Sequence, residues 1–183
     1  IFPELGWLDL PVIIPIAVGL ACGLFAGLIN GALIAYTRIP PFIATLGMMV
    51  AARGLSKWWS KGNPISFPTE SFAAIGKGMM PVIIFIALAC YVALRNVRGD
   101  EFAVVLTTAN EEAARITGIK VEHHKILVYV IAGMLASVAA IVLSSKNLTA
   151  QAGMGVMYEL DAIAMTVIGG VSLAGGRGSI VGT

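Results

Sequence analysis

The feature that most constrains this chain is a long uncharged segment near its start. Residues 11–36 read PVIIPIAVGLACGLFAGLINGALIAY and contain no charged side chain. At about 1.5 Å per residue, a helix of this length crosses the roughly 30 Å hydrocarbon core of a bilayer with some tilt. The segment ends at Thr37, before a basic turn that carries the proline pair Pro40 and Pro41, and such a pair stops a helix. Residues 11–36 are therefore predicted to span a membrane.

The composition supports a lipid-embedded class for the whole chain. Residues of the set AVILMFWYC make up 58% and charged residues 12% of its 183 residues, and the mean hydropathy is +0.90. Soluble domains carry about 25% charged residues, so this chain has too few charges to cover a water-exposed surface. The net charge of +2 includes no basic arm, which argues against a nucleic-acid partner.

Four further apolar segments complete the predicted architecture. They occupy residues 42–56, 79–94, 126–143 and 160–175, and residues 60–78 and 144–158 are predicted loops. The segment 42–56 is short and interrupted by Arg53, so a broken or re-entrant helix is possible, and the segment 160–175 breaks at Gly169 and Gly170. The predicted fold class is an all-α polytopic transmembrane bundle with about five membrane segments. Residues 1–183 are expected to belong to a single transmembrane domain whose N- and C-terminal spans are missing, because the chain starts without Met and stops in a glycine-rich stretch.

The distribution of Lys and Arg predicts an orientation. One side would hold Arg38, Arg95, Arg98, Arg115, Lys120 and Lys125, and the other Lys57, Lys61, Lys77 and Lys146. Because cytoplasmic loops carry the excess of basic residues, residues 95–125 are predicted to face the cytoplasm. Trp58 and Trp59, between two lysines, are predicted to anchor the opposite interface.

Four glycines at i,i+4 spacing mark one face of the first predicted span. Gly19, Gly23, Gly27 and Gly31 line up along this face and leave room for the backbone of another helix. Helix association in lipid depends on close packing of this kind. We expect these residues to form a helix-packing face rather than a flexible stretch.

A few polar residues are candidates for a transport path. The amide of Asn30 lies within hydrocarbon and needs a partner, for which a structural interhelix hydrogen bond is the commoner explanation and a water-filled path the alternative. Thr45 and Met48 could line the same path. Glu159 and Asp161 open the last apolar segment, where acids stabilise a helix N-terminus, and a role at the mouth of the path is again the alternative.

The polar loop contains the start and stop signals of a short helix. Thr108 with Glu111 fits a capping box, Asn110 is an alternative N-cap, and Gly118 suits the C′ position. A helix of about two turns is marginal alone, so it must pack on something. Either a soluble partner or the protein's own bundle would serve.

No catalytic constellation or metal-ligand set is apparent. His123 and His124 lack further ligands at suitable spacing, and the glycine-rich end lacks the Gly-Lys-Ser/Thr sequence of a nucleotide-binding loop. The chain is therefore predicted to be neither an enzyme nor a metal-binding protein.

Three sequence runs resemble the membrane permease subunits of bacterial ABC importers for monosaccharides such as ribose, galactose and xylose. They are Ile43-Ala44-Thr45-Leu46-Gly47, the run from Asn110 to Ile119, and the run from Tyr158 to Ser179. The resemblance implies a multi-pass protein of the bacterial inner membrane that works in pairs, receives sugar from a periplasmic sugar-binding protein and is driven by a cytoplasmic ABC ATPase. ATP and Mg²⁺ would be bound by that ATPase, and this chain would bind no cofactor. The residues implied to form the coupling helix that seats on the ATPase are Asn110, Glu111, Glu112, Ala113, Ala114, Arg115 and Gly118. One departure from the family pattern lies in the lead-in to this helix, residues 98–109, which lacks the family's glycine before Asn110.

Three alternatives remain at the level of the sequence. The first is a permease of the same superfamily for another small solute, such as a branched-chain amino acid. The second is an ion-coupled secondary transporter, which would need ionisable residues at the bilayer midplane and no docking helix. The third is a membrane scaffold with no transport role.

Overall fold

The computed structural model describes residues 13–37, 39–66, 70–77, 81, 83, 111–116, 118 and 120–172. This part of the chain is mostly helical, as predicted. Its helices are α1 (Ile13–Thr37), α2 (Pro41–Ser60), α3 (Glu70–Gly76), α6 (Glu111–Ile116), α7 (Val121–Asn147) and α8 (Tyr158–Ile168). Two very short strands, β1 (Ile65–Ser66) and β2 (Thr149–Ala150), pair in an antiparallel ladder.

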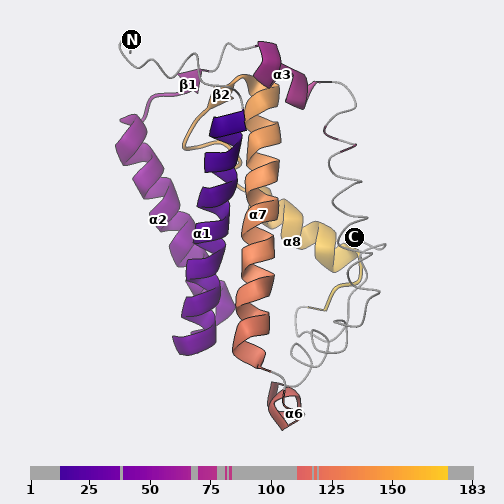
Figure 1. Cartoon of the computed structure of the whole chain (residues 1–183). Helices are drawn as coiled ribbons and strands as arrows, with labels where there is room; N and C mark the ends of the chain where they lie inside the picture. The colour runs from indigo at the N-terminus through magenta and orange to yellow at the C-terminus, as the bar shows by residue number, and fades with distance from the viewer. Residues whose placement is uncertain are drawn as a thin grey trace.

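The helices α1 and α7 form the centre of the described structure and lie side by side (Figure 1). Both are long and apolar enough to cross a membrane, with mean hydropathies of 2.1 and 2.7 in their most apolar windows. Only 6% of each window is buried inside the chain, whereas a core helix of a soluble protein would be mostly buried. These two helices agree with the predicted spans 11–36 and 126–143.

The second apolar segment forms one continuous helix rather than a broken one. Pro41 occupies the first turn of α2, where its missing N–H costs no hydrogen bond. The helix continues through Arg53 and ends where Lys61 and Gly62 adopt φ values of 51° and 77°. Beyond its contacts with α1, α2 diverges from the central pair toward this C-terminal end (Figure 1).

The predicted segments 79–94 and 160–175 show no further membrane-spanning helix within the described residues. The segment 79–94 lies outside the described residues apart from Pro81 and Ile83. The helix α8 has 11 residues, about 16 Å, and is too short to cross a bilayer. It ends at Gly169, and Gly170 has a φ of 87°, so the predicted break at this glycine pair is confirmed.

Both predicted loops contain regular structure. Ile65 pairs with Ala150 and Ser66 with Thr149, and α3 packs on the C-terminal part of α7. The buried hydroxyl of Ser145 donates a hydrogen bond to the carbonyl oxygen of Phe72. The loops predicted at 60–78 and 144–158 are confirmed at residues 61–64 and 151–157, which are turns or irregular. The prediction was wrong for α3, for the strands and for the last turn of α7, because contacts between residues far apart in sequence stabilise these short elements.

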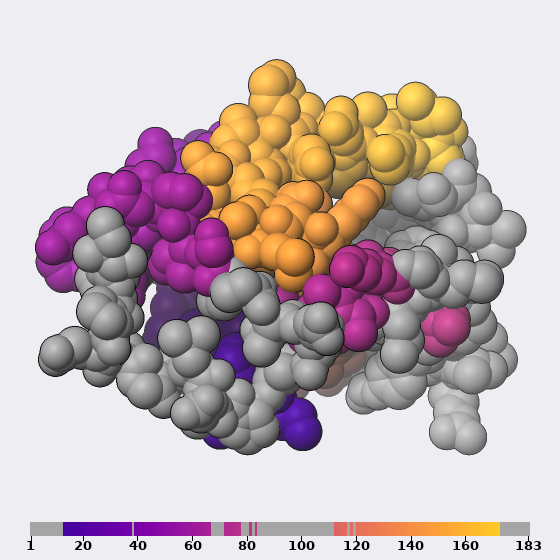
Figure 2. Space-filling model, turned by 90° about the horizontal axis from the view of Figure 1, so that it is seen from above, coloured from indigo at the N-terminus to yellow at the C-terminus, as the bar shows by residue number. Residues whose placement is uncertain are grey.

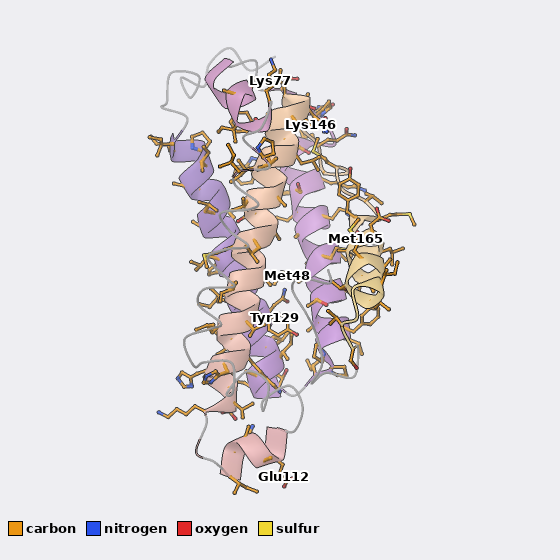
Figure 3. The ribbon with its side chains drawn as sticks, turned by 90° about the vertical axis from the view of Figure 1, so that its right-hand side faces the viewer. Met48, Lys77, Glu112, Tyr129, Lys146 and Met165 are labelled. Carbon is orange, nitrogen blue, oxygen red and sulfur yellow. The ribbon has the colours of Figure 1, made fainter. Side chains whose placement is uncertain are left out.

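The structure has two distinct ends. Lys77 and Lys146 lie at the end formed by α3 and the C-terminus of α7, whereas Glu112 lies at the opposite end on α6 (Figure 3). Lys57 and Lys61 belong to the last turn and cap of α2, at the same end as the strand β1 that follows them (Figure 1). This arrangement agrees with the predicted grouping of basic residues, for the members that the structure describes.

Candidate functional site: a short helix on a spanning helix pair

A short helix sits at the N-terminal end of α7. Ala114 of α6 and Val121, the first residue of α7, are both completely buried. Gly118 adopts a φ of 84°, and its amide donates to the carbonyl oxygen of Arg115 at 3.1 Å. Because a glycine tolerates this left-handed conformation without strain, the chain can end α6 and turn directly into α7.

An ion pair joins the two helices. The Arg115 guanidinium lies 2.6 Å from a carboxylate oxygen of Glu122, and both side chains are partly exposed. The sequence did not single out Glu122, because its partner lies on a different helix and the intervening turn hides the spacing. The pair and the two buried side chains together hold α6 against the start of α7.

The other predicted members of the coupling helix are only partly visible. Glu112 is exposed and Ala113 half-buried, and α6 begins at Glu111. Asn110, Thr108 and the side chain of Glu111 lie outside the described residues. The helix therefore packs on its own bundle through Ala114, which is one of the two alternatives that the sequence leaves open. It also presents Glu112 and Arg115 to the outside, as the other alternative, docking to a soluble partner, would require.

The four glycines of α1 all face α7. A Cβ atom at Gly19 would lie 3.5 Å from Ile141, at ordinary contact distance. At Gly23 it would lie 2.5 Å from the carbonyl oxygen of Gly133, and at Gly31 it would lie 2.7 Å from the Cα atom of Ile126. At Gly27 it would collide with the backbone of Tyr129 and Val130. The two helices run antiparallel, because later residues of α1 meet earlier residues of α7.

The closest approach of the pair involves a fifth glycine that the sequence did not single out. Gly133 of α7 lies against Gly23 and Gly27, and a Cβ atom there would collide with the carbonyl oxygen of Gly23. Backbone therefore meets backbone across the middle of the pair. In lipid, such close approach supplies much of the helix association energy.

Asn30 lies on α1 beside this packed face. Its Oδ1 atom is buried and has no hydrogen-bond partner within the described part of the chain. An unpaired buried acceptor costs on the order of 1–3 kcal/mol. The oxygen is therefore a group that water, cargo or a residue outside the described ranges could satisfy.

Among the described residues, no hydrogen bond joins the other candidate path residues to Asn30. The Thr45 hydroxyl donates within α2, to the carbonyl oxygens of Pro41 at 3.0 Å and Phe42 at 3.2 Å, and Met48 is half-buried on the same helix. Glu159 and Asp161 lie on α8, which is on the side of α7 away from α1 (Figures 1 and 2). The described residues thus show no single enclosed site that all five share.

Comparison with known proteins places these elements in context. Residues 2–183 match the family described as "Branched-chain amino acid transport system / permease component". The chain is 35% identical to the galactose/methyl galactoside import permease protein of Haemophilus influenzae, over 100% of this chain and 57% of that protein. It is 41% identical to the ribose import permease protein of Bacillus subtilis, over 84% of this chain and 50% of that protein. It is 36% identical to the L-arabinose transport system permease protein of Escherichia coli, over 83% of this chain and 48% of that protein.

These similarities cover this chain more fully than they cover the relatives. The chain spans about half the length of the curated relatives it matches. All three names describe permease proteins of import or transport systems, so the prediction of a transport component rather than an enzyme is confirmed at the level of the family. No solved structure matches the chain.

Proposed function

This chain belongs to the family of permease components described for branched-chain amino acid transport systems, and we propose that it forms part of the translocation path of an ATP-driven importer for a monosaccharide. The observation that carries the proposal is its 35–41% identity to permeases named for galactose, ribose and arabinose. Family membership and the two exposed apolar helices α1 and α7 support a membrane protein. We further propose that the chain crosses the bacterial inner membrane several times, with about five membrane segments.

Two alternatives compete with an ATP-driven sugar importer, one with a different cargo and one with a different driving force. The family description names branched-chain amino acids, whereas the relatives cited above are named for sugars, so a branched-chain amino acid permease is the second candidate. An ion-coupled secondary transporter is disfavoured. It would need ionisable groups at the bilayer midplane and no docking helix. Of the long described helices, α1 carries no ionisable group of this kind, α7 carries none between Lys125 and Lys146, and α2 carries Arg53 alone within its apolar stretch.

We assign the coupling role to the region 108–118. Two features support this assignment: α6 is too short to be stable alone, and it is fixed to α7 by buried Ala114 and by the Arg115–Glu122 ion pair. A partner that moves α6 would therefore also move α7, a continuous helix of 27 residues whose glycine-faced contact with α1 is the most extensive contact between described helices. Asn110, Glu111, Glu112, Ala113, Arg115 and Gly118 complete the proposed seat.

The proposed partners follow from the same function. A cytoplasmic ABC ATPase would hold ATP and Mg²⁺ and seat on α6, a periplasmic sugar-binding protein would deliver cargo, and a second permease copy would complete the path. Asn30 is proposed as a path residue because its carbonyl oxygen is buried without a donor in the described structure. Thr45, Met48, Glu159 and Asp161 remain weaker candidates.

Uptake by the protein from its complete gene, together with its ATPase, tests this proposal. Uptake of labelled ribose, galactose and arabinose is expected, and uptake of leucine is not. Arg115→Glu is expected to reduce sugar uptake, because the new carboxylate would face that of Glu122 at the α6–α7 joint.

The charge-swapped double variant Arg115→Glu with Glu122→Arg separates two roles. If Arg115 acts by holding α6 on α7, the swap restores uptake and ATP hydrolysis together. If Arg115 instead contacts the ATPase directly, the swap leaves both low. Normal uptake in the single variant would remove the coupling role from this helix, and uptake of leucine alone would favour the second candidate.

A further inference from the structure

The C-terminal end of α2 carries a surface feature that the transport function leaves unexplained. Lys57, Trp58, Trp59 and Lys61 line a shallow hollow, and the two indole side chains are 74% and 78% exposed. Figure 1 shows that this end of α2 stands apart from α1 and α7. Two large apolar rings are thus presented outward beside two ammonium groups.

The position of this hollow along α2 matches a membrane interface. Trp58 follows Pro41 by 17 positions, which corresponds to about 26 Å of helix, close to the thickness of the hydrocarbon core. Phe42, Ile43 and Val50 of the same helix expose 60–65% of their surfaces. Arg53 lies one turn before Lys57, so the stretch without charge is residues 42–52. If that stretch lies in hydrocarbon, the long side chain of Arg53 extends toward the nearer interface, and the four residues of the hollow lie at the level of the lipid headgroups, on the side opposite α6.

The charge of the hollow is not balanced within the described structure. The helix α2 contains no acidic residue, and the ion pair seen among the described residues is Arg115–Glu122 at the other end. The charged side chains described at this end are all lysines, namely Lys57, Lys61, Lys77 and Lys146. A second copy of the same surface would bring like charges together, whereas a phosphate would complement them.

We propose that this hollow binds the headgroup of an anionic phospholipid, such as phosphatidylglycerol, in the leaflet that faces away from α6. The lysine ammonium groups would contact the phosphate while their methylene stems and the two indole rings lie along the glycerol and upper acyl region. The site would fix the depth of α2 in the bilayer. This proposal rests on α2 lying in a membrane and is independent of the cargo and of the ATPase.

The test uses the complete protein in nanodiscs that contain brominated lipid, which quenches tryptophan fluorescence on contact. Brominated phosphatidylglycerol and brominated phosphatidylcholine are compared at equal mole fraction. The signal of Trp58 and Trp59 is the difference between the protein and its Trp58→Phe/Trp59→Phe variant. We expect stronger quenching by the anionic lipid, with its apparent affinity reduced by roughly fivefold for each lysine lost in Lys57→Gln and Lys61→Gln.

The matched control is Lys77→Gln with Lys146→Gln, which removes the same charge from the same end but outside the hollow. This control should keep the preference for the anionic lipid. Equal quenching by both lipids would overturn the proposal, because it would show no preference for the anionic headgroup. An equal loss in the control pair would also overturn it, because the general charge of this end, rather than the hollow, would then attract the lipid. Absence of quenching by both lipids, with cross-linking of introduced cysteines between two copies, would instead assign the hollow to a subunit contact. Size-exclusion profiles of all variants verify that each is folded.

Discussion

At the scale of single residues, close backbone contact sets what the helix pair α1–α7 tolerates. A methyl group at Gly27 would enter the backbone of Tyr129 and Val130, so Gly27→Ala is expected to destabilise the protein by about 1–3 kcal/mol. The control is Gly47→Ala, since Gly47 is also helical but has open space around its Cβ position, and alanine there favours the helix by up to about 1 kcal/mol. Thermal midpoints in detergent, followed by fluorescence-detected size exclusion, measure both. Equal midpoints would contradict the packing seen here.

The unpaired oxygen of Asn30 gives a second residue-scale prediction. Because Oδ1 has no donor among the described residues, Asn30→Leu is expected to leave the thermal midpoint unchanged or raised, while uptake per folded molecule falls. Ser144→Ala is the control, since that hydroxyl donates within its own helix to the carbonyl oxygen of Ile141 and its loss should not lower uptake. A lower midpoint with normal uptake would show that Asn30 has a structural hydrogen bond instead.

The sequence reveals some of these residue-level features and conceals others. The i,i+4 spacing shows that the four glycines share a face of α1, but it cannot show that α7 covers this face or that Gly133 lies at the crossing. Glu122 is concealed for the same reason, because its partner Arg115 belongs to another helix. In each case the missing information is which surfaces meet, and that is set by tertiary packing.

At the scale of elements, α3 depends on one buried hydroxyl of α7. Ser145 is 1% exposed and donates to the carbonyl oxygen of Phe72, while Gly76 lies against the backbone of Lys146. Ser145→Ala would remove this hydrogen bond between α7 and α3, at a cost of about 0.5–1.5 kcal/mol. Faster amide hydrogen exchange over residues 70–76 is the expected result. Ser144→Ala is the control, because Ser144 donates within its own helix to Ile141, and equal exchange in the two variants would contradict the role of Ser145.

Element boundaries show where local sequence signals stop being sufficient. The apolar run 126–143 predicts the middle of α7, but the helix extends to Val121 and Asn147 through charged residues that water at the bilayer surface can solvate. The strands β1 and β2 are two residues each and form only because they pair with each other. Periodicity finds long elements, whereas short ones exist through contacts distant in sequence.

At the scale of the whole molecule, the two ends should lie on opposite sides of a membrane. The helix α6 with Glu112 is at one end, and Lys77 and Lys146 are at the other (Figure 3). Between them α7 has 27 residues, or about 40 Å of helix, which exceeds the hydrocarbon thickness. The surface of α7 between these ends is apolar and largely exposed, so a bilayer between the two ends is the solvent that suits it.

Labelling of single introduced cysteines tests this arrangement in the complete protein, with the native cysteines replaced. We expect Glu112→Cys to react with a membrane-impermeant thiol reagent only after the cytoplasmic face is exposed, because the basic residues beside α6 favour that side. Lys77→Cys should react from the outside of intact cells. Reaction of both positions from the same side would show that α7 does not cross the membrane, and the assignment of α6 as the ATPase seat would fail with it. Reaction with the sides exchanged would keep the span but place α6 where no cytoplasmic ATPase can reach it.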